Sequence, residues 1–298
     1  MVDVSPELFA TRPDGIELCY QTFGDRRDEP LLLVMGLGGP MTWWDPGLCT
    51  RLAEAGFFVI RYDNRDMGRS SHLSGAVTLP KLAAAFAGAH VRAPYTLVDM
   101  AEDGLAVLDA LDLDTAHVCG ISMGGMIVQT MAVSHPSRVN SLTSIMSTTG
   151  RRTVGWQHPA VMPTLLSKGG GKDAYVKSSV ATWRLIGSPG YPEPEDAVRR
   201  RAAETYERGI TAAGVGRQML AILTQPNRTE TLRRVTVPTT VIHGLADKMV
   251  HVSGGRATSM AVPGSELILI DGMGHDLPAD LWDTYVAAIR RTADRATA

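Results

Sequence analysis

The sequence predicts an α/β fold: a mostly parallel central sheet flanked by helices, with a helical cap inserted into it. Three observations carry this prediction. Near-continuous apolar runs of strand length recur along the chain, segments with helical periodicity lie between them, and a long stretch in the second half lacks strong strand signals. Such apolar runs indicate strands that are buried on both faces, which is the arrangement in parallel sheets covered by helices.

The N-terminal part contains the first expected strands. Residues 16–23 alternate between polar and apolar side chains well enough for an edge strand. Residues 31–35 and 57–62 are near-continuous apolar runs, and residues 44–55 between them can supply a crossover helix. Together these segments predict a first βαβ unit.

A second unit of the same kind follows. Residues 96–99, Thr-Leu-Val-Asp, resemble a capping box, in which the two end residues bond to each other's backbone amides. Beyond them, apolar residues fall on one helical stripe that leads into a short strand at residues 115–119. A buried helix is expected at residues 125–133, and another strand at residues 142–146.

The pattern changes after this strand. Residues 150–234 have no strong strand run, but they contain several prolines, three glycines at residues 169–171, and helical segments at residues 195–208 and 218–223. We interpret this region as a mostly helical cap. The glycine patch lacks the spacing and the following Ser or Thr of a phosphate-binding loop, which argues against nucleotide binding there.

Strand signals return after the cap, at residues 236–243 and 266–270, and residues 281–291 predict a C-terminal amphipathic helix. The sheet therefore resumes after the insertion. The resulting division is a first core part at residues 1–149, a helical cap at residues 150–234 and a second core part at residues 235–298.

The composition argues against two classes of function. The 298 residues are 44% hydrophobic and 20% charged, with a formal net charge of -2. The chain therefore has no basic field for nucleic acid or for an anionic membrane surface. No apolar run approaches the roughly 18 residues that a membrane-spanning helix needs. We expect no nucleic-acid partner and no stable insertion into a membrane.

The N-terminus and the cysteines indicate in which cellular compartment the protein is expected. The N-terminus carries acidic residues where a secretory signal carries basic ones. The three cysteines, Cys19, Cys49 and Cys119, are an odd number without zinc-type spacing, which suits a reducing compartment. We therefore expect a cytoplasmic protein.

The segment G-I-S-M-G at residues 120–124 supplies a candidate nucleophile. A serine between two glycines at this spacing can occupy a strand-to-helix turn that is too sharp for bulkier neighbours. The pattern alone is weak, because a serine at this place can also cap a helix. Here a predicted strand precedes it and a predicted buried helix follows it, so Ser122 is the candidate nucleophile.

A serine hydroxyl needs a histidine to accept its proton and a carboxylate to orient that histidine. In chains with such an elbow, the order is serine, acid, histidine, each in a loop at the carboxyl end of a strand. Of the histidines after the cap, His243, His251 and His275, only the last lies in a loop directly after a strong strand. Asp247 follows the preceding strand. We therefore predict His275 as the base, Asp247 as its orienting acid and a structural role for His243.

Two backbone amides are expected to stabilise the oxyanion that forms when the serine attacks a carbonyl. Amides serve well because they are fixed before the reaction begins. One donor should be Met123, directly after the nucleophile. The other should be Leu37, in the glycine-rich loop at residues 35–39 after the first buried strand. These two residues complete the predicted site.

The spaced motifs resemble those of the α/β-hydrolase superfamily over nearly the whole chain outside the cap. Residues 62–70 are similar to the family's D-x-R-G-x-G-x-S stretch, with Asp66 where Gly is usual, and Met35 stands where many members have His. Both departures resemble the branch of serine esterases that contains aclacinomycin methylesterase. We expect Asp63 and Arg65 of this stretch to form a structural ion pair behind the active site.

The resemblance implies an α/β-hydrolase fold and roles for single residues. The family's nucleophile, acid and base fall on Ser122, Asp247 and His275, and its oxyanion amides fall on Leu37 and Met123. The expected protein is a serine carboxylic ester hydrolase that works through an acyl-enzyme. Its partner would be a small to medium apolar or polyketide-like ester, with no cofactor and no metal ion.

Other functions remain open at this point. The same triad supports C–C bond hydrolysis and cofactor-free perhydrolysis or haloperoxidase chemistry, and a non-catalytic ligand-binding protein can share the fold. Epoxide and haloalkane hydrolases are disfavoured because they carry Asp at the position of Ser122. Seven large side chains could line an apolar pocket, and roughly two of them should contact substrate. They are Trp43, Trp44, Trp156, Met162, Tyr175, Trp183 and Met219.

Overall fold

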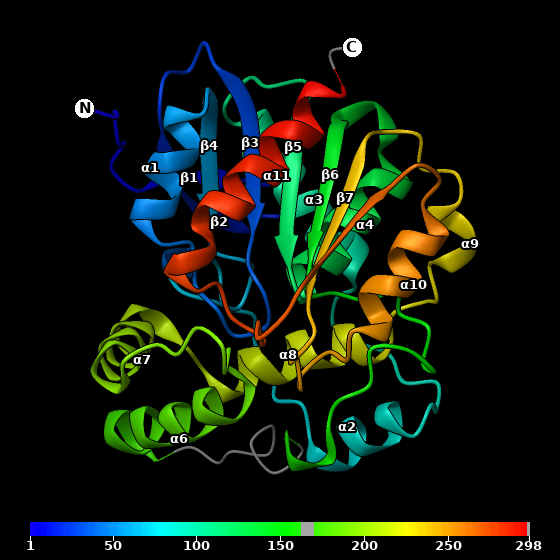
Figure 1. Ribbon diagram of the computed structural model, residues 1–298. Helices are drawn as coiled ribbons and strands as arrows, with labels where there is room; N and C mark the ends of the chain where they lie inside the picture. Colours follow the sequence, from blue (N-terminus) through cyan, green and yellow to red (C-terminus); the bar gives the residue numbers. More distant parts are fainter. Residues whose placement is uncertain (162–169, 297–298) are drawn as a thin grey trace.

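The computed structural model describes residues 1–161 and 170–296. Within them, eight strands form one sheet in the order β1-β2-β4-β3-β5-β6-β7-β8 (Figure 1). The first two strands run antiparallel to their neighbours, and the other neighbouring pairs are parallel. The strands are β1 (Leu8–Thr11), β2 (Glu17–Phe23), β3 (Glu29–Val34), β4 (Phe57–Tyr62), β5 (Ala116–Ile121), β6 (Val139–Ile145), β7 (Thr239–Gly244) and β8 (Glu266–Ile270).

The central strands are the ones that the apolar runs predict. Every residue of β4, β5 and β7 is buried, as expected for strands covered by helices on both faces. The predicted α/β class with a mostly parallel sheet is therefore confirmed. The predicted edge position of the first strand is wrong, because β1 pairs with the outer side of β2. The four residues of β1, Leu-Phe-Ala-Thr, are too few to show the alternation typical of an edge strand, and the apolar Leu8 and Phe9 are exposed.

Helices cover both faces of the sheet (Figure 1). One face carries α1 (Pro46–Glu54) and α11 (Trp282–Asp294), whose apolar residues share a core with β3 and β4. The opposite core contains residues of α3 (Leu97–Asp109), α4 (Met123–Ser134) and α10 (Ser253–Ala261). The expected capping box is present at the start of α3, since Thr96 and Asp99 bond to each other's backbone amides.

Further helices lie beyond the carboxyl ends of the strands (Figure 1). They are α6 (Gly171–Ile186), α7 (Glu195–Gly209) and α8 (Ala212–Leu223), and α2 (Leu79–Phe86) packs against α8. The short helix α9 (Thr229–Leu232) lies at the side of the sheet against α10. Short 3-10 turns are η1 (Met41–Trp43), η2 (Pro136–Arg138), η3 (Pro159–Val161) and η4 (Ala279–Leu281). We refer to α6, α7, α8 and their connections as the cap. Gly169 of the glycine patch lies outside the described residues, and the exact domain bounds stay a prediction.

Buried ion pairs link the cap to the segment after β4. The sequence predicts a pair between Arg65 and Asp63, but Arg65 instead contacts both carboxylate oxygens of Asp103 in α3, each at 2.6 Å. Asp63 instead contacts Arg208 of α7 at 2.8 Å, and its side chain is fully buried. The predicted pair is wrong because each buried charge has a partner from a distant element, which the local spacing of the sequence does not reveal.

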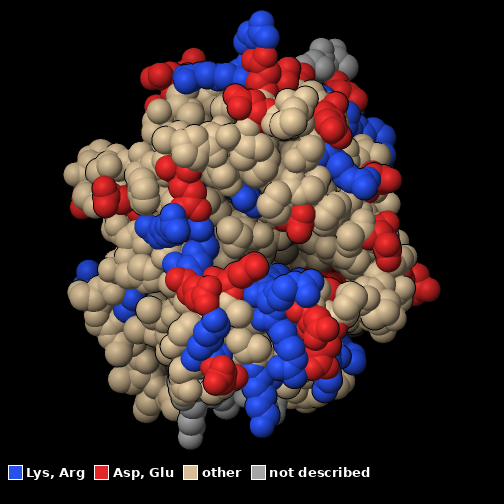
Figure 2. Space-filling model, turned by 90° about the vertical axis from the view of Figure 1, so that its left-hand side faces the viewer, with Lys and Arg blue, Asp and Glu red and all other residues tan. Residues whose placement is uncertain are grey.

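The surface and the helices bear on possible partners. On the face shown in Figure 2, acidic and basic side chains lie next to each other and do not gather into a field of one sign. Among the helices that the structure describes, none combines the length and the apolar content that crossing a membrane requires. Cys19, Cys49 and Cys119 are all buried and unpaired.

Candidate active site

Ser122 lies at the turn between β5 and α4, in a backbone conformation that non-glycine residues seldom adopt. Its φ is 54° and its ψ is -116°. The turn is tight enough to exclude side chains on both flanking glycines. A Cβ atom on Gly120 would lie 2.2 Å from the carbonyl oxygen of Gly124, and a Cβ on Gly124 would lie 2.0 Å from that of Val34. The glycines therefore permit the strained turn that presents Ser122.

Contacts from the end of β6 and from Ser147, two residues beyond it, hold the backbone of the turn. The amide of Ser122 donates to Ile145 O at 2.9 Å, and the Ser147 hydroxyl donates to Ser122 O at 2.7 Å. Ser147 is not among the residues that the sequence predicts for the site. Its position directly after a predicted strand is the signal that could have revealed it, because the carboxyl ends of parallel strands share one edge of the sheet.

The three residues predicted as nucleophile, base and acid lie together. Nε2 of His275 is 3.0 Å from Oγ of Ser122, and Nδ1 of His275 is 2.7 Å from Oδ2 of Asp247. Because an ionised carboxylate only accepts hydrogen bonds, Nδ1 carries the proton and donates it to Asp247. Nε2 is then free to accept the proton of the serine hydroxyl. This is the geometry of a general base oriented by an acid.

The surroundings of Asp247 favour its ionised form. Its Oδ1 accepts hydrogen bonds from the amides of Met249 at 2.8 Å and Val250 at 2.9 Å. Burial by itself raises the pKa of Asp247, but the charge of His275 and the hydrogen bonds from His243 and His275 outweigh it and lower the pKa to about 2. Asp247 is therefore a carboxylate at neutral pH.

His243 lies next to Asp247, the predicted acid. Its Nε2 is 2.8 Å from Val250 O and 3.5 Å from Oδ2 of Asp247, and the residue is fully buried. The contact with a backbone carbonyl fixes the ring against the loop that carries Asp247. This placement agrees with the structural role that we predicted for His243.

The loop after β3 passes directly beside the nucleophile. A Cβ atom on Gly36 would lie 3.2 Å from Cβ of Ser122 and 3.8 Å from its Oγ. Leu37 is the next residue of this loop. Met123 is the first residue of α4, and amides in the first turn of a helix point away from it and carry partial positive charge. Met123 thus adjoins Ser122 in the chain, and Gly36, the residue before Leu37, lies beside it, while the two oxyanion roles stay a prediction.

A cap segment holds the loop that carries His275. The amide of His275 donates to Ile186 O at 2.7 Å, and that of Gly274 donates to the Ser188 hydroxyl at 2.8 Å. The amide of Gly190 donates in turn to Gly272 O at 2.9 Å. The position of the base therefore depends on residues 186–190, which connect α6 and α7.

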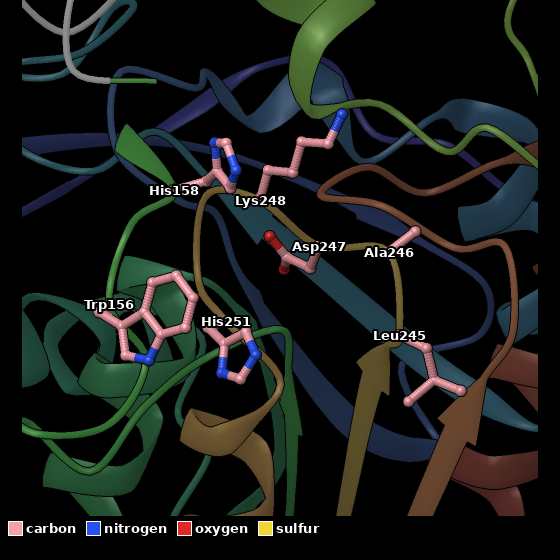
Figure 3. Close-up of a pocket in the computed structure, with 7 residues that line it drawn as sticks. All are labelled: Trp156, His158, Leu245, Ala246, Asp247, Lys248 and His251. Carbon is pink, nitrogen blue, oxygen red and sulfur yellow. The ribbon is translucent and has the colours of Figure 1, made fainter. Parts of the chain in front are cut away.

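Two cavities flank the loop that carries Asp247. One, of about 250 Å³, is lined by Trp156, whose ring stacks on His251 at a centroid distance of 4.2 Å (Figure 3). The other, of about 400 Å³, lies against α6 and α7 and is lined by Trp183. Of the seven large side chains considered as pocket residues, these two tryptophans line cavities. Trp44 is buried in the core, and Met162 lies outside the described residues.

Among residues 1–161 and 170–296, no group of three or more His, Cys, Asp or Glu side chains is arranged to hold a metal ion. The polar side chains that meet at the site are a hydroxyl, an imidazole and a carboxylate. Such a set is equipped for nucleophilic attack with proton transfer.

The fold and this site define a class of protein. A family model described as alpha/beta hydrolase fold matches residues 29–280, and the chain belongs to that family. The chain is thus a hydrolase, as the sequence predicts.

Two relatives and a solved structure are similar to this chain over most of its length. Rhodomycin D methylesterase DauP of Streptomyces sp. (strain C5) is 30% identical, over 93% of this chain and 94% of its own. Rhodomycin D methylesterase DnrP of Streptomyces peucetius is 29% identical with the same coverage. Among solved structures, the esterase EaEST from Exiguobacterium antarcticum aligns with a TM-score of 0.76 at 18% identity, over 97% of this chain and all of that one. This last likeness concerns the fold alone.

Proposed function

We propose that this chain is a serine carboxylesterase in which Ser122, His275 and Asp247 act as nucleophile, base and orienting acid. The observation that carries the proposal is the pair of short contacts that His275 makes, 3.0 Å to the hydroxyl and 2.7 Å to the carboxylate. Methylesterase relatives that match along most of the chain support ester hydrolysis as the reaction.

The first half of the reaction would form an acyl-enzyme. Oγ of Ser122 attacks the ester carbonyl carbon while Nε2 of His275 takes the hydroxyl proton. The carbonyl oxygen becomes an oxyanion that accepts hydrogen bonds from the amides of Leu37 and Met123. When the tetrahedral intermediate collapses, the carbon–alkoxy bond breaks, and His275 gives its proton to the departing alkoxide.

The second half would release the acid. Nε2 of His275 takes a proton from water, and the resulting hydroxide adds to the acyl carbon. The bond to Oγ of Ser122 then breaks, and the serine recovers its proton from His275. Throughout both halves, the Asp247 carboxylate stabilises the imidazolium that forms and keeps Nδ1 protonated.

We further propose a small to medium apolar or polyketide-like ester as substrate. The support is the printed activity of the two methylesterase relatives and the presence of tryptophan-lined cavities beside the acid and base loops. Rhodomycin D, after which those relatives are named, is the first compound to assay.

Active-site labelling tests the catalytic proposal. A fluorophosphonate should react with the native protein at Ser122, and Ser122→Ala should abolish both labelling and hydrolysis of p-nitrophenyl esters without changing the melting temperature. Failure of the native protein to label, with the fold intact, would instead favour a ligand-binding role.

Substrate assays separate esterase activity from the other reactions that the same triad supports. p-Nitrophenyl esters are compared with a vinylogous diketone ring-fission product and with peracid formation from acetate and hydrogen peroxide. We expect the highest kcat/KM with the esters. A higher kcat/KM for the diketone would overturn the proposed reaction but keep the proposed nucleophile.

A further inference from the structure

The loop at residues 35–41, which we call the oxyanion loop, is fastened at both ends by residues that follow β4. Met35 O accepts a hydrogen bond from Nδ2 of Asn64 at 2.8 Å. The amide of Met41 donates to Oδ1 of Asp63 at 2.7 Å. These contacts fix where the loop begins and ends, but they do not reach its apex, where Leu37 and Gly38 lie.

The apex is held by a side chain from the cap. The amide of Gly38 donates to Oε1 of Gln218 at 3.0 Å, and Nε2 of Gln218 donates to Arg65 O at 2.8 Å. Gln218 is 1% exposed. The orientation of its amide group follows from these partners, because the reverse orientation would place a donor against the Gly38 amide and an acceptor against a carbonyl.

The helix that carries Gln218 is itself anchored at the preceding residue. Nε and Nη2 of Arg217 contact the two oxygens of Asp66 at 2.8 and 2.6 Å, and both side chains are buried. The Tyr95 hydroxyl also donates to Asp66, at 2.8 Å. Asp66 has a φ of 67°, a conformation that Asp tolerates better than most residues. An acid where the family pattern usually has glycine thus anchors α8.

We propose that Gln218 is a positioning residue that holds the oxyanion loop in its working shape. This inference rests on the proposed esterase function, in which Leu37 supplies one of the two oxyanion donors. Leu37 precedes Gly38, so fixing the Gly38 amide restricts how the peptide units around Leu37 can rotate. The Leu37 amide then stays directed at the space beside Ser122, and seating of α8 is coupled to formation of the oxyanion site.

The first test replaces Gln218 with methionine, a side chain of similar length that cannot donate a hydrogen bond and accepts one only weakly. Removing an oxyanion donor costs about 10²- to 10³-fold in kcat, and misplacing one should cost part of that. For Gln218→Met we expect kcat to fall about 10- to 100-fold, with KM within twofold of the parent. The inhibition constant of a trifluoromethyl ketone, whose adduct with Ser122 bears an oxyanion, should rise by the same factor as kcat falls.

A second variant distinguishes loss of the Gln218 hydrogen bonds from a general loss of folding. In Gln218→Glu, a carboxyl oxygen can still accept from the Gly38 amide, and the protonated form can donate to Arg65 O. We expect this variant to recover a large part of the kcat that Gln218→Met loses. Equal loss of kcat in both variants would overturn the proposal.

Tyr95→Phe is the matched control. It removes one buried hydrogen bond beneath the same helix but leaves Gln218 and Gly38 untouched, so the melting temperature should fall while kcat stays within twofold. If Tyr95→Phe lowered kcat as much as Gln218→Met, general weakening of the cap would explain the effect, and the specific role of Gln218 would be overturned.

Hydrogen exchange separates this inference from the proposed function. In Gln218→Met, the amides of residues 36–39 should exchange at least tenfold faster than in the parent, whatever the activity. A parent that neither hydrolyses esters nor binds the trifluoromethyl ketone would overturn the proposed function. Unchanged exchange in the variant would overturn the role of Gln218 by itself.

Discussion

The nucleophile turn and the oxyanion loop lie side by side but are held in different ways. The turn at Ser122 is enclosed by the core: glycines on either side press against backbone, and Ile145 of β6 and Ser147, just after β6, each contribute one hydrogen bond. The oxyanion loop and the loop of His275 each take hydrogen bonds from the cap. The nucleophile is therefore positioned by the sheet, whereas the oxyanion loop and the loop of His275 also depend on the cap.

This difference indicates which part of the site the core holds rigidly and which parts substitutions in the cap can change. Changes to the cap should leave the strained serine in place and alter the rate through the oxyanion donors or the base. Changes to the two glycines that flank Ser122 should affect folding itself. The four predictions below test this division, beginning with the largest expected effect.

Asp247→Asn removes the carboxylate that orients His275 and changes no residue of the cap. An amide can present its NH₂ group to Nδ1 of His275, which favours the tautomer that cannot accept the serine proton. We expect kcat for p-nitrophenyl esters to fall roughly 10⁴-fold. The melting temperature and circular dichroism serve as controls for folding. A loss of less than tenfold would remove Asp247 from the proposed mechanism.

Gly124→Ala tests the steric enclosure of the turn. The new Cβ would lie 2.0 Å from Val34 O, a backbone atom that cannot move aside cheaply. We expect the free energy of unfolding in urea to fall by about 3 kcal/mol or more. The matched control is Gly216→Ala in α8, where the nearest atom to the new Cβ is 3.5 Å away. That change should be neutral or stabilising, and a similar loss in both variants would contradict the steric argument.

Arg208→Met tests the buried attachment of α7 to the core. It leaves the buried Asp63 carboxylate without its cation, although the amides of Met41 and Arg69 still donate to it. We expect a loss of about 3 kcal/mol in the free energy of unfolding. The control is Arg69→Met, because Arg69 is 59% exposed and contacts Glu7, so its removal should cost at most about 1 kcal/mol. Equal losses would mean that burial of the Arg208 pair has no special effect.

Acid titration tests the charge of Asp247. Its pKa is about 2 in the folded chain, below the ordinary value of 3.8. The folded state thus favours the carboxylate, and this contribution is complete above about pH 4 and is lost as the pH falls toward 2. Its size is on the order of 2 kcal/mol. Urea unfolding of the parent and Asp247→Asn should show a stability difference that shrinks over this range, and a constant difference would argue against the shift.

Local patterns in the sequence were enough to predict the sheet and the candidate site residues. Long apolar runs mark the buried strands, and the rule that parallel strands end at one edge brought Ser122, Asp247 and His275 into one neighbourhood. The structure places these three side chains in contact. Their catalytic roles stay a proposal until labelling and turnover are measured.

Contacts between distant elements could not be predicted in this way. Gln218 and Ser188 lie on the cap, and nothing in their local sequence indicates which loop they contact. Arg208 and Asp63 are 145 residues apart, so their pairing depends on how the cap seats on the core. The strand β1 escapes prediction for another reason, since four residues, Leu-Phe-Ala-Thr, are too few to show a strand period.

The hydrogen bonds from residues 186–190 to the loop of His275 have a consequence for engineering. A graft that replaces the cap by that of a relative also replaces the acceptors for the amides of Gly274 and His275. Chimeras that retain residues 186–190 and Gln218 of this chain, and replace other parts of the cap, should keep an active catalytic site while adopting a new substrate specificity. Junctions placed inside that segment should yield folded proteins that turn over poorly.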